Sequence, residues 1–426
     1  MKKLLIVSPY FPPVNGADMQ RIRMSLPYFA ANGWHAEVIM VDEQYADLPM
    51  DELLLQSIPV QVKVHKVKAL KKSITSKLGL GSIALRSLWF YRQKINELLK
   101  THAYDLIYFS TTQFPVCILG AYFKKRNGIP YVIDMQDPWF SNYYENKPKA
   151  QRPPKYWFSY RLNKYLEPIA MNSVDGLVSV SDNYISDLKN RYPAIKNIPA
   201  VTITFGAFEP DMQIAEQNKN TFPNLLDSKY TNIVYIGRGG ADMHRAVTPL
   251  FNSLRAALNE GNEALKSLRF YFIGTSYAAN GQGKPSILPL ARQMGVEESV
   301  IEITDRISYY HTLITLQQAD ALFIPGSDDP KYTASKIYPY LLTPKPLLAI
   351  FNKASSVINI MKEYGVKQVY DYETVTNANI STFLSSLING STEPPQYHSE
   401  AVNKYSARQM TINQCKLFDS ITGGEN

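Results

Sequence analysis

Cysteine is almost absent from the 426-residue chain, which contains only Cys117 and Cys415. Two cysteines so far apart build neither a disulfide framework nor a cysteine-based metal site, and their scarcity fits a reducing compartment. Long apolar runs are also missing, since none approaches the roughly 20 residues of a membrane-spanning helix. The first run, residues 4–7, ends at Ser8 and Pro9, too short for a signal-peptide core, with no small-residue cleavage site after it. We therefore expect a soluble, cytoplasmic protein.

Acidic residues are scarce in the first half of the chain. Residues 1–200 carry 26 Lys and Arg against 16 Asp and Glu, whereas residues 201–426 carry 19 against 21. Within 61–100, ten basic residues accompany a single acid, Glu97. This asymmetry predicts two halves with different partners, the first of them facing something anionic.

The chain has no internal repeat and no low-complexity tract; short apolar runs alternate instead with segments of helix length. Runs such as 4–7 and 233–236 are apolar on both faces, as in buried parallel strands. Residues 17–32 have helical periodicity and end at the C-cap signal Asn32-Gly33. We expect strands at 3–8, 36–41, 60–66, 105–109, 130–134, 176–181 and 199–204, and then at 232–236, 268–273, 300–303, 320–324, 346–350 and 366–370.

This order predicts an α/β fold with two doubly wound, Rossmann-like domains. The expected divisions are an N-terminal domain at 1–205, a polar linker at 206–230, a C-terminal domain at 231–395, and a helical segment at 396–426 that packs back on the N-terminal domain. Two such sheets facing a central cleft would direct the carboxyl ends of their strands into it, where ligands of open α/β sheets bind. The loops after the strands are therefore the candidate sites.

The loop after the first strand contains Asn15 and Gly16. Glycine allows a positive φ and a close backbone approach to a ligand, and the helix that follows favours an anion at its N-terminus. An ordinary βα turn would explain the same residues. The loop has no GxGxxG fingerprint, which argues against a nicotinamide-dependent dehydrogenase.

The loop after strand 130–134 contains Asp134, Gln136 and Asp137. Two carboxylates three residues apart at the end of a strand can orient substrate hydroxyls or take part in acid–base catalysis. The alternative is an Asp-Pro turn, in which the carboxylates only cap the backbone.

A glycine-rich turn, residues 237–240, follows strand 232–236 and contains Arg238 and Gly239, with His244 and Arg245 close behind. Glycines let the backbone approach a phosphate, and arginine offers it two parallel donors. Glycine-rich turns are common after strands, so this tetrapeptide is a weak signal by itself.

The loop after strand 320–324 leads into a helix that opens at Thr333 or Ser335. A hydroxyl N-cap, free backbone N–H groups and Lys336 together make an anion-binding site. Asp328 and Asp329 precede it. Plain helix capping would also explain the hydroxyls.

Four segments, taken together and in this order, resemble the glycosyltransferase-4-like group of nucleotide-sugar glycosyltransferases: LLIVSPYFPPVNGADMQRI (4–22), PYVIDMQDPW (130–139), YIGRGG (235–240) and SKIYPYLLTPKPLLAI (335–350). The resemblance spans nearly the whole chain. It implies the GT-B architecture and the transfer of a sugar from a nucleotide-diphosphate donor to a hydroxyl acceptor. Members of the group usually retain the anomeric configuration and need no metal, so the expected cofactor list is empty and the donor is a substrate.

The resemblance also assigns residues. Arg238 matches the arginine that holds the donor diphosphate, and Arg245 lies near the position of a second cation. A cationic clamp suits this chemistry because negative charge grows on the leaving diphosphate in the transition state. Asp137 is assigned to positioning the acceptor or the sugar. The expected donor-binding residues are Gly16, Arg238, Gly239, Arg245, Asp328, Asp329, Ser335 and Lys336, and the expected catalytic residues are Asp134, Gln136 and Asp137.

The chain departs from the group at three positions. Many relatives have two glutamates eight positions apart, the second of which binds the ribose hydroxyls; these positions fall on Lys331 and Pro339. Asp328 or Asp329 would have to replace them. Gln136 stands where the group often has histidine, although some relatives carry arginine there within a similar Asp-Pro-Trp motif.

The resemblance offers an explanation for the excess of basic residues in the first half of the chain. The first domain of such enzymes binds the acceptor, which is often a lipid-linked glycan at the membrane surface. Residues 61–100 and 147–164 interleave apolar and aromatic side chains with Lys and Arg, as interfacial helices do. Solvated helix faces over buried aromatics would explain either cluster alone. We expect peripheral association with the inner face of the plasma membrane. Nucleic acid is not expected as a partner, since no nucleic-acid motif accompanies the charge.

The leading hypothesis is a retaining glycosyltransferase in cell-surface polysaccharide or lipid-linked glycan synthesis. A catalytically silent relative that binds a nucleotide or a glycan and scaffolds a complex is the alternative, favoured by the missing glutamates. A nucleotide-sugar epimerase or hydrolase ranks last, because it would need more acid–base groups than a chain with six histidines places near these loops.

Overall fold

The computed structural model describes residues 1–140, 148, 152, 156–328, 336–393 and 395–423. They form two compact units, the first made of residues 1–206 and 405–426 and the second of residues 207–404. The second unit is thus inserted in sequence between two parts of the first.

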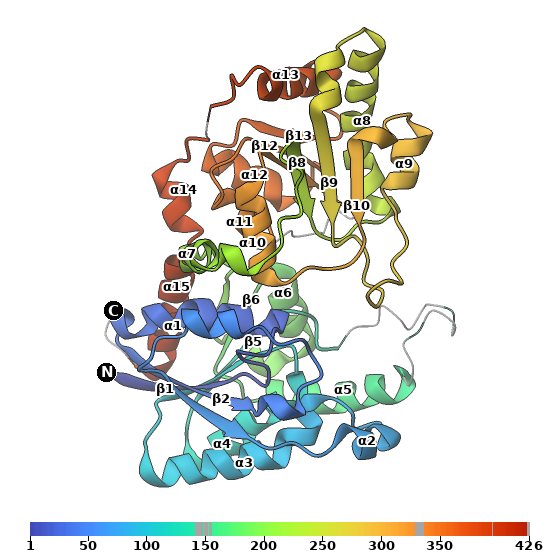
Figure 1. The fold of residues 1–426 in the computed structure, drawn as a ribbon. Coiled ribbons are helices and arrows are strands. Elements are labelled where there is room, and N and C mark those ends of the chain that lie inside the picture. Colours follow the sequence, from blue (N-terminus) through green and yellow to red (C-terminus); the bar gives the residue numbers. More distant parts are fainter. Residues whose placement is uncertain (141–147, 149–151, 153–155, 329–335, 394, 424–426) are drawn as a thin grey trace. The chain divides into compact units, whose positions relative to one another are not determined.

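The described part of the first unit has a seven-stranded parallel sheet in the order β3-β2-β1-β4-β5-β6-β7 (Figure 1). Its strands are β1 (Lys2–Val7), β2 (Trp34–Val41), β3 (Lys63–Val67), β4 (Leu106–Ser110), β5 (Tyr131–Met135), β6 (Gly176–Ser179) and β7 (Ala200–Thr202). The central strands β1, β4 and β5 are nearly continuous apolar runs, because helices cover both faces of the sheet.

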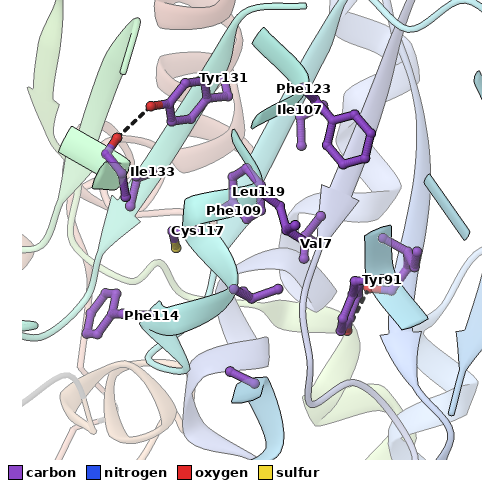
Figure 2. Close-up of a cluster of buried hydrophobic side chains, with 14 of the residues drawn as sticks. Val7, Tyr91, Ile107, Phe109, Phe114, Cys117, Leu119, Phe123, Tyr131 and Ile133 are labelled. Atoms are coloured by element: carbon purple, nitrogen blue, oxygen red, sulfur yellow. Dashed lines mark hydrogen bonds between the residues drawn. The ribbon is translucent and has the colours of Figure 1, made fainter. Parts of the chain in front are cut away.

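Helices surround this sheet, with α3 and α4 on one side and α1 and α15 on the other (Figure 1). The α-helices of the unit are α1 (Gln20–Phe29), α2 (Lys72–Thr75), α3 (Ile83–Thr101), α4 (Ile118–Asn127), α5 (Tyr156–Met171), α6 (Asp182–Arg191) and α15 (Ala407–Thr422). Figure 2 shows the core between the sheet and α3 and α4, where Val7, Phe109 and Ile133 of the strands pack with Tyr91 and Phe123 of the helices.

The last helix, α15, is part of the core of the first unit. The buried ring of Phe418 packs edge-on against Tyr108 and Trp34, with ring centroids 4.9 and 5.6 Å apart. At the start of α15 the backbone comes so close to Gly206 that a Cβ there would lie 2.6 Å from the Ala407 nitrogen. Through these contacts, the C-terminal segment of the chain packs against the N-terminal segment of the same unit.

The described part of the second unit has a six-stranded parallel sheet in the order β10-β9-β8-β11-β12-β13. Its strands are β8 (Thr231–Ile236), β9 (Leu268–Ile273), β10 (Val300–Ile303), β11 (Ala321–Pro325), β12 (Leu347–Phe351) and β13 (Gln368–Asp371). The α-helices are α7 (Glu209–Gln217), α8 (His244–Asn259), α9 (Leu288–Gln293), α10 (Tyr309–Gln318), α11 (Ile337–Leu341), α12 (Ser356–Tyr364), α13 (Asn377–Ile388) and α14 (Ser399–Lys404). In both sheets the strand order reverses beside the first strand of the unit, as in doubly wound folds.

The structure confirms the predicted fold class and a strand at each predicted place, and Gly33 ends the first helical segment in the left-handed conformation with φ +82°. The expectation of a linker at 206–230 is wrong, because this stretch contains α7. Pro210 suits the first turn of this helix, and Met212 and Ala215 on it are buried. Asp211 accepts hydrogen bonds from the hydroxyls of Tyr309 and Tyr310, which fix α7 to α10.

The apolar residues of the basic stretch 61–100 mostly serve the core. On α3, Ile83, Tyr91 and Ile95 are buried against the sheet, and Arg86 donates to backbone carbonyls. The core explanation therefore holds for most of α3, while Trp89 remains 55% exposed. No helix among the described residues is long and apolar enough to cross a membrane.

Candidate functional site

The loops at the carboxyl ends of β1, β4 and β5 form an acidic cluster in the first unit, centred on Asp134. Asp134 has a fully buried side chain and forms an ion pair with Arg21, whose Nε lies 2.7 Å from Oδ2. Ser110 Oγ and Gln136 Nε2 donate to the same oxygen at 2.8 and 2.9 Å. Arg21 also donates to the Ile203 carbonyl. No part of this side chain is exposed, which is at odds with the substrate contact or acid–base role expected for Asp134 from the sequence.

Gln136 connects two of these loops. Its side-chain amide donates to the Asp18 carbonyl at 3.0 Å and to Ser110 Oγ at 3.1 Å, as well as to Asp134. Gln136 is buried, and its hydrogen bonds connect the loop after β1 to the loop after β5.

Asp18 is a site residue that the sequence argument missed. Its buried carboxylate accepts hydrogen bonds from Thr111 Oγ1 at 2.7 Å and from the Thr112 amide at 3.1 Å. Burial raises its pKa above the ordinary value for aspartate, against the lowering effect of these hydrogen bonds. In the sequence, Asp18 appears only as an acidic residue just after the Asn15-Gly16 turn. Its partner Thr111 lies 93 positions later, and no sequence pattern connects the two residues.

Asp137 is the acid of this cluster that is exposed. Partial desolvation raises the pKa of its carboxyl group, and the nearby Asp18 carboxylate raises it further. The Tyr184 hydroxyl lies in the same neighbourhood, where burial and the charge of Asp137 raise the pKa of that tyrosine. Asp137 is thus the described carboxylate of the cluster that can both meet a ligand and accept a proton.

Gly16 does not use the positive φ that we expected, since its φ is −99°. Close packing explains the glycine instead: a Cβ there would lie 2.9 Å from Asp18 Oδ1 and 3.1 Å from Tyr10 Cβ. The glycine therefore allows the β1 loop to fold over the buried carboxylate of Asp18.

In the second unit, the glycine-rich turn after β8 is held by the loops of neighbouring strands. The Gly239 amide donates to the Thr275 carbonyl at 2.8 Å, and the Gly240 amide donates to Ser286 Oγ at 3.0 Å. Gly240 has φ +132°, a conformation that side chains rarely permit. Glu302 holds these loops together, because it accepts hydrogen bonds from Thr275 Oγ1 at 2.7 Å and from the Ser286 amide at 2.8 Å.

Arg238 lies in this turn and forms a bidentate pair with Asp242, with distances of 3.0 and 2.6 Å. The guanidinium and a hydrogen bond from Ser327 Oγ lower the pKa of Asp242. Both partners are partly exposed, with 26% of the Arg238 side chain and 38% of the Asp242 side chain accessible. The pair fixes the orientation of the guanidinium in the turn.

Lys336 approaches the same turn. Its ammonium contacts the Tyr235 hydroxyl, lies 4.6 Å from the centre of that ring, and is 2.7 Å from where a Cβ of residue 237 would be. Burial lowers the pKa of Lys336 to about 7, and the positive charge of Arg238 adds to this effect. Two cations brought together in this way make a place where an anion would be stabilised.

The remaining predicted donor residues lie around this turn in different ways. Arg245 is exposed and stacks over the Tyr372 ring at 4.7 Å, and His244 Nε2 is within 2.8 Å of the Ser286 carbonyl. Asp328 is exposed, and its amide donates to the Asp242 carbonyl. Asp329, Thr333 and Ser335 lie outside the described residues. In the part of the chain that is described, no cluster of three His, Cys, Asp or Glu side chains is placed to hold a metal ion.

No protein-family model and no curated protein sequence matches the chain. Solved structures do match: the N-terminal domain of Candida albicans trehalose-6-phosphate phosphatase has a TM-score of 0.54 at 11% identity, covering 99% of this chain and 97% of its own. An E. coli trehalose-6-phosphate structure bound with UDP-2-fluoro glucose has a TM-score of 0.52 at 10% identity, covering 99% of both chains. The UDP-forming α,α-trehalose-phosphate synthase of Burkholderia xenovorans has a TM-score of 0.50 at 12% identity, covering 100% of this chain and 98% of its own. The likeness and the two Rossmann-like sheets show that the chain has the GT-B fold.

Proposed function

We propose that the protein is a glycosyltransferase that moves a sugar from a nucleotide-diphosphate donor to a hydroxyl acceptor, as the glycosyltransferase-4-like group does. The observation that carries this proposal is the convergence of Arg238 and Lys336 on the glycine-rich turn after β8. A diphosphate bound there would meet two cations and closely approachable backbone.

The chemistry of the leaving group explains why both cations matter. Negative charge grows on the diphosphate as the glycosidic bond breaks, and fixed positive charges stabilise that state without reorganising. A bound anion would also restore the protonated form of Lys336, whose pKa is about 7 in its present surroundings. We propose that this clamp, with Arg245 near it, makes the reaction independent of a metal and other cofactors, and that the anomeric configuration is retained.

The ribose must be held differently from the pattern in many relatives. Pro339 occupies the position of their ribose-binding glutamate and lies inside α11, while Lys331 is outside the described residues. Asp328 is exposed beside the Asp242 turn and is our candidate replacement.

We further propose that the acceptor belongs to cell-surface polysaccharide or lipid-linked glycan synthesis and is met at the inner face of the plasma membrane. Ile74 of α2 and Trp157 of α5 are 63% and 64% exposed. Lys71 and Lys77 flank Ile74, and Arg161 lies 5.8 Å from the Trp157 ring. Exposed apolar side chains among cations are typical of interfacial surfaces.

A catalytically silent nucleotide-binding scaffold is the second candidate. The proline at position 339 favours it, because a side chain without donors or acceptors cannot bind the ribose hydroxyls. Such a protein would bind a nucleotide with the same cations and release no sugar.

Thermal unfolding with UDP, GDP, ADP, TDP and CMP tests the donor site. One diphosphate should raise the melting temperature selectively, since a ligand at 100 times its dissociation constant adds about 2.7 kcal/mol to stability. The matching nucleotide-sugar is then incubated with the protein, and slow release of free sugar would support transferase chemistry. Stabilisation without release favours the scaffold, and no response to any nucleotide contradicts both.

A further inference from the structure

Tyr235 lies near the end of β8 and contacts both cationic residues of the proposed anion site. Its side chain is 1% exposed and packs edge-on against Phe272, with ring centroids 6.0 Å apart. The hydroxyl donates a hydrogen bond to the Arg238 carbonyl at 2.9 Å and accepts one from the Lys336 ammonium. A buried, packed ring therefore places one oxygen atom between the backbone of Arg238 and the charge of Lys336.

The two hydrogen bonds of this hydroxyl differ in direction. A tyrosine hydroxyl carries a single proton, and here it donates that proton to the Arg238 carbonyl. Toward Lys336 the oxygen can then act only as an acceptor. An ammonium group is the better donor to such an oxygen, because hydrogen bonds from a charged donor are stronger than those from a neutral one. The hydroxyl of Tyr235 therefore favours the protonated form of Lys336.

Other groups around the Lys336 ammonium act in opposite directions. Desolvation lowers the pKa of Lys336 to about 7 and the positive charge of Arg238 also lowers it, whereas the Asp242 carboxylate raises it. The Tyr235 ring lies 4.6 Å from the ammonium, a distance at which the aromatic face attracts a cation. Glycine at position 237 leaves room for this contact, since a Cβ there would lie 2.7 Å from Lys336 Nζ and 2.8 Å from Tyr235 Oη. In this setting, one hydrogen bond decides over which pH range the lysine stays charged.

We propose that Tyr235 is a positioning residue of the anion site: its hydroxyl holds the protonated Lys336 beside the Arg238 turn and thereby sets the pH above which the site loses its second cation. The inference rests on the proposed function, because it concerns the site to which we assign the donor diphosphate. It goes further by giving a core residue of the sheet control over the pH range of binding. A purely structural Tyr235 would support binding equally at every pH.

Variants of the full chain separate these two roles. Tyr235→Phe removes the hydroxyl and keeps the ring. Tyr340→Phe is the matched control, because it removes an equally buried hydroxyl that accepts a hydrogen bond from the Ile236 amide at 2.8 Å. Lys336→Met, alone and combined with Tyr235→Phe, shows whether Tyr235 acts through Lys336.

Two measurements are made on each variant. Isothermal titration calorimetry measures the binding of UDP, GDP, ADP, TDP and inorganic pyrophosphate from about pH 5.5 to about pH 9, a range that spans the titration of Lys336. Carbon-13 NMR follows the Cε signal of Lys336 against pH without any ligand, and the absence of this signal from Lys336→Met identifies it. The titration of the ligand itself cancels, because parent and variant are compared at the same pH.

In Tyr235→Phe the pKa of Lys336 should fall by about one pH unit, as expected for a lost hydrogen bond to a charged group. Binding should be roughly fourfold weaker than in the parent near pH 7 and almost unchanged at about pH 5.5 and about pH 9, where the lysine has the same charge in both proteins. Tyr340→Phe should keep the parent profile. Tyr235→Phe should have no further effect on binding when Lys336 is already methionine.

The proposal is overturned if Tyr235→Phe weakens binding by the same factor at every pH, or if Tyr340→Phe shifts the profile as far. Additive effects of Tyr235→Phe and Lys336→Met would overturn it as well. An unmoved Lys336 titration in a protein that binds nucleotides would refute this inference and leave the proposed function standing. A shifted titration in a protein that binds pyrophosphate and no nucleotide would refute the proposed function and leave the role of Tyr235 standing. A parent that binds neither would refute both.

Discussion

At the carboxyl ends of their strands, the two units present opposite chemistry on the same kind of scaffold. The first unit gathers Asp18, Asp134 and Asp137 at the carboxyl ends of β1 and β5. The second gathers Arg238 and Lys336 around a glycine-rich turn. A shared parallel topology thus supplies the location of each cluster, while the loop residues decide its charge.

The ion pairs of the two units differ in the same way. Arg21 and Asp134 are fully buried, whereas Arg238 and Asp242 are partly exposed. The first pair therefore serves the fold, and we expect the second to serve ligand binding.

The largest expected effect comes from breaking the buried pair. Asp134→Ala should destabilise the protein by about 3–5 kcal/mol, because it leaves the Arg21 charge buried without its partner. Asp242→Ala, the matched change at the exposed pair, should cost no more than about 1 kcal/mol. Urea unfolding followed by circular dichroism measures the free energy of unfolding of both variants. Equal losses would show that the two ion pairs do not differ in their contribution to stability.

Arg238→Ala should weaken binding of the nucleotide diphosphate by roughly ten- to hundredfold, as expected for a lost charged hydrogen bond. Arg292→Ala, at an exposed position on α9 of the same unit, is the control. Isothermal titration calorimetry measures both. Unchanged affinity in the Arg238 variant would place the anion site elsewhere.

The basic surface of the first unit should respond to charge removal. Lys71→Gln together with Lys77→Gln should lower partition to anionic vesicles by about thirtyfold at low salt, at about 1 kcal/mol for each lysine. The control is Lys219→Gln with Lys266→Gln, which removes the same charge from the second unit. Equal partition of the two double variants, measured by vesicle sedimentation, would argue against a membrane-facing first unit.

The smallest effect is a pH dependence. With a pKa of about 7, Lys336 keeps its charge below neutrality and loses it as pH rises, so nucleotide affinity should fall roughly tenfold between about pH 7 and pH 9. Lys336→Met should bind weakly with a flat profile in the same titration. It should also raise the stability of the nucleotide-free protein at low pH, because the folded state then no longer holds a buried ammonium. A parent affinity that rises with pH would contradict this role.

Local sequence patterns predicted the strands and the loops that follow them, because buried parallel strands are apolar on both faces and β8 or β11 stands out at once. The same patterns pointed to Arg238, Lys336 and Asp137. They could not show that Asp134 binds Arg21, since the two lie 113 positions apart and only the packed sheet brings them together. Asp18 was missed for the same reason, and α7 was missed because its polar, proline-containing sequence hides a short buried face.

The packing of α15 has a consequence for the order in which the chain can fold during synthesis. Residues 207–404 are complete as a unit before the ribosome has made α15, whereas the sheet of the first unit still lacks the ring of Phe418 over Trp34 and Tyr108. An apolar face of the earliest-made strands therefore stays uncovered until the last helix emerges. We therefore expect the half of the protein that is translated first to finish folding last.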